Sequence, residues 1–123
     1  MGVIIDIKPV GEFVPKILFL CSKNKLRSPT AEAIFCDVEG WNVYSAGISN
    51  DAEVHVALED IEWADYIFVM ENAHKKKLSN KFGSVINGQS VISLGIPDDY
   101  EYMEQTLIDI LRSKVPGYIK QTQ

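Results

Sequence analysis

Residues 16–29 read KILFLCSKNKLRSP, and this stretch indicates the class of fold. Its first part, Lys16 to Leu20, is a nearly continuous apolar run of the kind that a parallel sheet buries on both faces. Ser28 and Pro29 then open a helix, because proline suits the first helical turn. A buried strand, a short polar loop and a helix in this order are typical of an α/β protein.

The rest of the chain repeats this alternation of strand and helix. After the first helix, which Gly40 ends, further strands are expected at 42–46, 66–70 and 91–94, and further helices near 54–61, 75–81 and 103–111. We therefore predict a single α/β domain over residues 1–123, with a four-stranded parallel sheet and helices on both faces (flavodoxin-like). Residues 1–14 form an extension, in which Val3–Ile7 would add an edge strand.

Composition excludes several classes of protein. The chain has 123 residues, 46% hydrophobic and 24% charged, which is ordinary for a globular domain. No apolar stretch approaches the ~20 residues of a membrane span, and the N-terminus lacks the pattern of a secretory signal. The net charge of -5 argues against a general nucleic-acid binder. The cysteines, Cys21 and Cys36, are too few for a disulfide scaffold and favour a cytoplasmic location.

The loop after the first strand holds a cysteine and an arginine six residues apart, Cys21 and Arg27. Ligands of such sheets bind beyond the carboxyl ends of the strands, where a thiol that faces a helix N-terminus should be a thiolate. The N–H groups of residues 22–26 can form a nest for phosphate oxygens, and a guanidinium can grip two of them. Ser28 can donate to the sulfur, and Asn24 tolerates the left-handed backbone that a tight loop requires. The pattern predicts a cysteine nucleophile and an arginine clamp for a phosphate ester.

Five segments of the chain also match a known family in order. They are ILFLC (17–21), RSPTAEAIF (27–35), SAG (45–47), DYIFVM (65–70) and DDY (98–100). Together with Asn24 they resemble the low-molecular-weight protein tyrosine phosphatases. The resemblance extends from about Lys16 to Tyr100 and implies that family's four-stranded fold and its phosphocysteine mechanism.

By matched position, the resemblance implies Cys21 as nucleophile, Arg27 as phosphate clamp and Asp98 as general acid, with no metal and no cofactor. The substrate would be bound by the loop and by residues that support it, namely Ser22, Lys23, Asn24, Lys25, Leu26, Ser28, Ser45 and Tyr100. The chain has Lys23 where the family usually has glycine, Leu26 where it often has a second cysteine, and Asp99 where it has proline. Either Asp98 or Asp99 could be the acid, and Asp98 is the prediction.

The predicted substrate is a phosphomonoester, either a phosphotyrosine protein or a small aryl phosphate; nucleotides, RNA ends and metabolites stay open. Three other functions are alternatives. An arsenate reductase would need Cys36 to resolve its adduct. A phosphocysteine carrier would not need Arg27, and a non-catalytic module that binds phosphate or RNA ends would not need Asp98.

Three other features of the chain receive a structural interpretation. His55 and His74 are too isolated in the sequence for a metal site. The run His74–Lys77 indicates a solvated helix face, or else a patch that steers anionic substrates together with Lys23 and Lys25. Cys36 lies beside the apolar stripe of the first helix and is expected to be inert.

Overall fold

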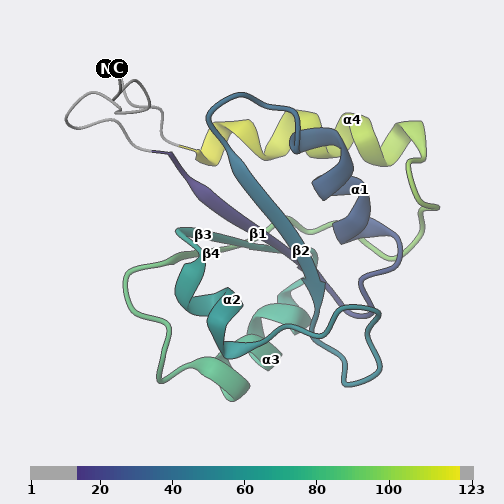
Figure 1. The fold of residues 1–123 in the computed structure, drawn as a ribbon. Helices are drawn as coiled ribbons and strands as arrows, with labels where there is room; N and C mark the ends of the chain where they lie inside the picture. The colour runs from purple at the N-terminus through teal and green to yellow at the C-terminus, as the bar shows by residue number, and fades with distance from the viewer. Residues whose placement is uncertain (1–13, 120–123) are drawn as a thin grey trace, which may run out of the picture.

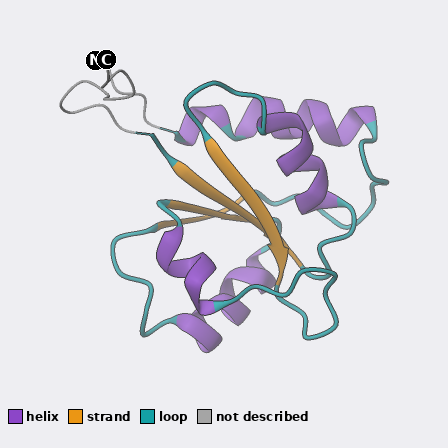
Figure 2. Cartoon of the chain, in the orientation of Figure 1, coloured by secondary structure: helices purple, strands orange, loops and turns teal. Residues whose placement is uncertain are grey.

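A computed structural model describes residues 14–119 of the chain. The chain folds around a four-stranded parallel sheet (Figure 2). The strands are β1 (Lys16–Cys21), β2 (Asn42–Gly47), β3 (Tyr66–Val69) and β4 (Ser90–Ser93), and they lie in the order β2-β1-β3-β4. The predicted fold class is therefore confirmed. The edge strand predicted at Val3–Ile7 lies outside the described residues.

Helices cover both faces of this sheet (Figure 1). They are α1 (Arg27–Phe35), α2 (Leu58–Trp63), α3 (Asn72–Phe82) and α4 (Gln105–Lys114), and a short 3-10 helix, η1 (Pro116–Tyr118), follows. In Figure 1, α1 and α4 lie on one face, and α2 and α3 lie on the other. Within the part of the chain that the structure describes, no helix is both long and apolar enough to cross a membrane.

The central strand β1 divides its side chains between two hydrophobic cores. Ile17, Phe19 and Cys21 belong to the core under α1 and α4, whereas Leu18 and Leu20 belong to the core under α2 and α3. Successive side chains of a strand point to opposite faces, so a strand covered on both sides needs an uninterrupted apolar run. This burial fixes the carboxyl end of β1, and therefore the position from which the loop at Cys21 starts.

The second helix begins later than its apolar spacing predicts. Residues 54–57 precede it, because the backbone of Gly47 is hydrogen-bonded to this segment on both sides. The helix starts at Leu58, where Oδ2 of Asp60 accepts a hydrogen bond of 2.8 Å from the N–H of Ala57. A carboxylate in the first turn satisfies one of the free N–H groups there and favours this boundary.

Candidate active site

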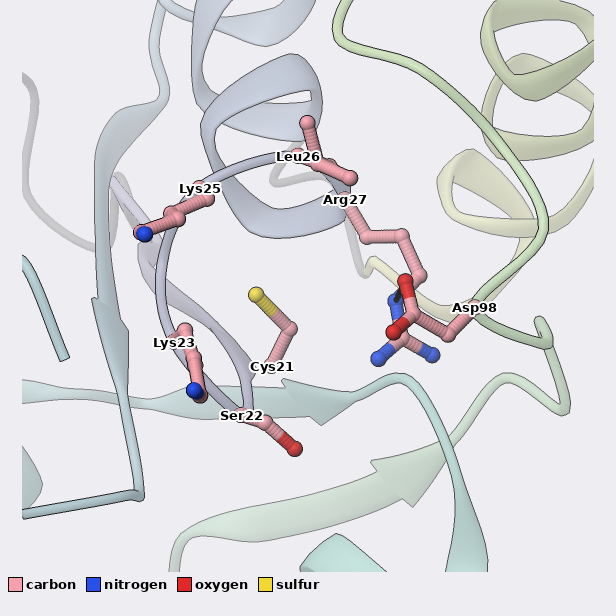
Figure 3. Close-up of a pocket in the computed structure, with 7 residues that line it drawn as sticks. All are labelled: Cys21, Ser22, Lys23, Lys25, Leu26, Arg27 and Asp98. Carbon is pink, nitrogen blue, oxygen red and sulfur yellow. Dashed lines mark ion pairs between the residues drawn. The ribbon is translucent and has the colours of Figure 1, made fainter. Parts of the chain in front are cut away.

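A pocket of about 110 Å³ lies beyond the carboxyl end of β1. Seven residues line it, and all are labelled in Figure 3: Cys21, Ser22, Lys23, Lys25, Leu26, Arg27 and Asp98. The sulfur of Cys21 lies inside the curve of the loop, and Arg27 and Asp98 stand together on one side of it (Figure 3). The fold thus brings the predicted nucleophile, clamp and acid into one site.

The loop turns its first carbonyl groups away from the pocket. The carbonyl oxygens of residues 21, 22 and 23 accept hydrogen bonds from the N–H groups of Ile48, Ser49 and Glu53, at 3.0, 2.8 and 2.9 Å. In a trans peptide the N–H points opposite to the C=O. The N–H groups of Ser22, Lys23 and Asn24 therefore point away from the segment 48–53. Successive N–H groups of a tight loop can form a nest that binds anions.

Asn24 holds the bend of this loop from behind. Its backbone is left-handed, with φ at 57°, as its residue type led us to expect. Its Nδ2 donates to Oγ of Ser28 and to Oγ of Ser45, both at 3.0 Å. Ser45 in turn donates to Oε1 of Glu32 at 2.5 Å, a partner that sequence reasoning did not identify. The side chains of Ser28, Ser45 and Glu32 thus support the loop through Asn24.

The predicted nucleophile, Cys21, has the hydroxyl of Ser28 beside it. Oγ of Ser28 lies 3.0 Å from Sγ of Cys21, and both residues are buried. Since Ser28 already accepts from Asn24, its hydroxyl hydrogen is free to point at the sulfur or at the carbonyl of Ala46, 3.3 Å away. A hydroxyl in this position can stabilise a thiolate by hydrogen bonding.

Arg27 is buried, and its guanidinium is held by groups from distant parts of the chain. Nη1 donates to Oε2 of Glu71 at 2.6 Å and to the carbonyl oxygen of Ile96 at 2.8 Å. Nε lies 3.7 Å from Oδ1 of Asp98, whose side chain is largely exposed. Both hydrogen bonds leave from Nη1, so the Nε–Nη2 edge is the one that can take two oxygens of a phosphate.

His74 lies beside the pocket-lining Ser22, a position that sequence reasoning missed. It does not share the solvated face of its lysine neighbours but is 3% exposed, with Nε2 3.0 Å from Oγ of Ser22. Its Nδ1 accepts a hydrogen bond of 3.2 Å from the backbone N–H of Glu71. Burial lowers the pKa of His74, and the nearby positive charge of Arg27 lowers it further. The signal in the sequence was Leu78, a buried residue one helical turn later on the same face.

The remaining predicted residues lie outside the pocket wall. Tyr100 packs against the core under α1 and α4, so its role in substrate binding stays a prediction. Lys75, Lys76 and Lys77 are exposed on α3. Cys36 is exposed just after α1 and not buried beside its stripe. Among residues 14–119, no group of three or more His, Cys, Asp or Glu side chains gathers in a way that could hold a metal ion.

Comparison with known proteins finds similarity to phosphatases. The profile of the low molecular weight phosphotyrosine protein phosphatase family matches residues 16–62. The YwlE arginine phosphatase from Geobacillus stearothermophilus is 23% identical with a TM-score of 0.62, over 84% of this chain and 94% of that one. A YwlE mutant from Bacillus subtilis is 26% identical with a TM-score of 0.62, over 80% and 94% of the two chains. SP-PTP, a low molecular weight protein tyrosine phosphatase from Streptococcus pyogenes, has a TM-score of 0.71 at 17% identity, over 86% and 94%. No curated protein sequence gives a significant match.

These likenesses agree with the site described above. The matched segment 16–62 contains the whole loop from Cys21 to Arg27, and the solved structures share the fold of most of the chain. The predicted resemblance to this phosphatase family is confirmed over residues 16–62. The chain is thus similar to the low-molecular-weight protein tyrosine phosphatases in sequence over residues 16–62 and in fold over most of its length.

Proposed function

We propose that this chain hydrolyses phosphomonoesters through a phosphocysteine on Cys21, with Arg27 as the phosphate clamp and Asp98 as the general acid. The observation that carries the proposal is the arrangement of these three groups around one pocket beside the loop between Cys21 and Arg27. Sulfur, guanidinium and carboxylate supply the nucleophile, the charge stabilisation and the proton that the reaction needs.

In the first step, Sγ of Cys21 attacks the phosphorus and the bond from phosphorus to the leaving oxygen breaks. Asp98 gives its proton to that oxygen, so the alcohol or phenol leaves neutral. Negative charge spreads over the equatorial oxygens, where the loop N–H groups and the Nε–Nη2 edge of Arg27 stabilise it. The products of this step are phosphocysteine, a free alcohol and an ionised Asp98.

The second step reverses the role of Asp98. Its carboxylate takes a proton from water while the water oxygen attacks the phosphocysteine. The sulfur–phosphorus bond breaks, inorganic phosphate leaves and the Cys21 thiolate returns. Ser28, 3.0 Å from the sulfur, stabilises the thiolate as the leaving group of this step.

The substrate that we propose is a phosphoprotein, with phosphotyrosine or a small aryl phosphate as its simplest form. Of the solved structures compared above, the one from Geobacillus stearothermophilus carries the name of arginine phosphatase and the one from Streptococcus pyogenes that of tyrosine phosphatase, so phosphoarginine is the alternative to compare. The free thiol on which the reaction depends suits a reducing compartment such as the cytoplasm.

An arsenate reductase is not favoured, because the second cysteine is misplaced for it. Cys21 precedes the N-terminal end of α1 and Cys36 follows its C-terminal end. A helix of nine residues is about 13 Å long at 1.5 Å per residue, far beyond the reach of a disulfide.

The test is turnover of p-nitrophenyl phosphate by the purified chain in the presence of a chelator. We expect Cys21→Ser to reduce turnover by at least ~10³-fold, because serine has no ionised form at neutral pH, and Cys36→Ser to serve as the unaffected control. Mass spectrometry of acid-quenched wild type should find one phosphate on Cys21. Retained turnover in Cys21→Ser, or loss of activity in chelator, would contradict the proposal. Peptides with phosphotyrosine, phosphoarginine and phosphoserine then rank the substrates by kcat/KM.

A further inference from the structure

Ser22 lines the pocket with a side chain whose partner is His74, a residue that the proposed mechanism does not use. Oγ of Ser22 lies 3.0 Å from Nε2 of His74, and the imidazole is buried between Ser22 and the start of α3. A hydroxyl and an imidazole nitrogen can each be donor or acceptor, so the direction of this bond needs a separate argument.

The backbone of Glu71 settles that direction. Its N–H can only donate, and it donates to Nδ1 of His74 at 3.2 Å. Nδ1 therefore carries no hydrogen, and a neutral imidazole must carry its single hydrogen on Nε2. Nε2 then donates to Oγ of Ser22. The hydroxyl hydrogen of Ser22 is consequently turned away from His74.

The charges around the imidazole agree with a neutral ring. Burial is the main influence that lowers the pKa of His74, and Arg27 from α1 and Lys77 from α3 act in the same direction. Glu71 and Asp98 act in the opposite direction. Positive charge on the ring would also place two N–H groups, those of Nδ1 and of Glu71, against each other.

The hydroxyl hydrogen of Ser22 is free for another acceptor, since this half-buried residue lines the pocket. Its side chain points away from the sulfur of Cys21 (Figure 3), and that sulfur already has Ser28 beside it. A phosphate held by the loop would bring its oxygens to this wall of the pocket. Anionic oxygens are the strongest acceptors available there.

We propose that His74 is a positioning residue that turns the hydroxyl of Ser22 into a dedicated donor to a phosphate oxygen in the pocket. The inference rests on the proposed phosphatase reaction and adds to it a donor outside the backbone nest. Because the direction is fixed before the substrate arrives, the donor requires no reorganisation when charge develops on the phosphate. The start of α3 thereby supports the site twice, through the carboxylate of Glu71 on Arg27 and through its backbone N–H on His74.

The experiment compares variants of both residues with p-nitrophenyl phosphate as substrate. Loss of a hydrogen bond to a charged group predicts that Ser22→Ala lowers kcat/KM about 10- to 100-fold, while Ser22→Thr, which keeps the hydroxyl, retains most of it. His74→Leu removes the Nε2 donor and should give a similar loss, and His74→Gln, whose amide can still donate, should recover part of it. The double variant Ser22→Ala/His74→Leu should be no worse than the worse single variant, because both remove the same donor.

Urea unfolding identifies any variant that loses activity through loss of structure. Among the variants, Ser22→Ala and His74→Gln should change the packing least. Losses that add in the double variant, or an unchanged kcat/KM in Ser22→Ala, would overturn the inference. Absence of turnover in the wild type would instead contradict the proposed function, so the two failures are distinct.

A second readout does not depend on activity. The chain has two histidines, so ¹⁵N spectra of the imidazoles are assigned with a single His55→Gln variant. We expect His74 at neutral pH to have a protonated Nε2 and a bare Nδ1. A protonated Nδ1 would reverse the bond to Ser22 and overturn the inference.

Discussion

Nη1 of Arg27 lies 2.6 Å from Oε2 of Glu71, so the cation that would clamp the phosphate is itself held by an anion from the residue before α3. The pair uses one corner of the guanidinium and leaves the Nε–Nη2 edge toward Asp98 and the pocket. A buried arginine needs such partners, because a charge taken out of water without one is costly. The proposed binding of substrate and the stability of the fold would therefore depend on the same contact.

We predict that Glu71→Ala lowers both activity and stability, because it leaves Arg27 buried with less compensation. A loss of about tenfold or more in kcat/KM is expected, together with a lower urea midpoint. Glu71→Gln should lose less in both, since its amide oxygen still accepts from Nη1. Glu39→Ala, at an exposed glutamate, is the control. An active and fully stable Glu71→Ala would mean that Ile96 alone suffices to hold the guanidinium.

The two adjacent aspartates should differ in their effect on the leaving group. Asp98 lines the pocket 3.7 Å from Nε of Arg27, whereas Asp99 is exposed and absent from the pocket wall. A general acid typically contributes ~10²–10⁴-fold, and more as the leaving group becomes more basic. Asp98→Asn should therefore impair phenyl phosphate much more than p-nitrophenyl phosphate, and Asp99→Asn should affect neither strongly.

The measurement is single-turnover formation of the phosphoenzyme over a series of leaving-group pKa values. A steeper dependence in Asp99→Asn instead would show that Asp99 is the acid and that our assignment to Asp98 is wrong. If neither variant shows it, the acid is another group.

Gly47 is the position where a methyl group should do most harm to the loop. A Cβ there would lie 2.5 Å from Cβ of Ala52, 2.7 Å from the carbonyl oxygen of Ser22 and 3.0 Å from the backbone nitrogen of Asn24. Gly47→Ala must therefore push the loop backbone, which should destabilise the fold by about 1–3 kcal/mol. Displacement of the phosphate nest should lower kcat/KM by about 10²-fold.

The matched control for this change is Gly117→Ala, because no heavy atom would lie within 4 Å of the added Cβ. Circular dichroism melts and p-nitrophenyl phosphate turnover are measured on both variants. Equal activity in the two would show that the end of β2 does not press on the loop.

Burial of His74 predicts a dependence of stability on pH. Its pKa in the folded chain is lowered from 6.5, so between the two values the unfolded chain binds more protons. Stability is therefore complete above pH 6.5 and falls as the pH drops from there toward the lowered pKa. Urea midpoints measured through this interval should fall less in His74→Gln than in wild type.

The exposed histidine supplies the control for this prediction. His55→Gln should leave the fall in urea midpoint as it is in wild type. A His74→Gln variant with the same fall as wild type would mean that another group is responsible for it.

The strands of the sheet and the loop could be predicted from the sequence, because each is specified by a short run of contiguous residues. The runs 17–20 and 66–69 are apolar throughout, and the structure buries all eight of these side chains. Cys21 ends β1 and Arg27 begins α1, so the short loop between them is enough to place the two residues together.

What the sequence did not reveal depends on contacts between distant residues. His74 stands beside three exposed lysines, and its contact with Ser22, 52 residues away, is a tertiary contact that the local run does not reveal. Residues 54–57 have helical spacing, but pairing with Gly47 keeps them out of α2. In both cases a tertiary partner overrides a local pattern.

The partners of Arg27 also determine when the site can exist during synthesis. The loop leaves the ribosome first. Glu71, Ile96 and Asp98, which contact Arg27, follow that residue by 44, 69 and 71 positions. A nascent chain that ends within the family-matched segment 16–62 therefore carries the nucleophile and the clamp but nothing to hold the guanidinium in place. Since domains tend to fold as units once their sequence has emerged, phosphate binding should appear only after the acid loop has left the ribosome. The thiol of Cys21 would thus be present in the cell before the complete active site has formed around it.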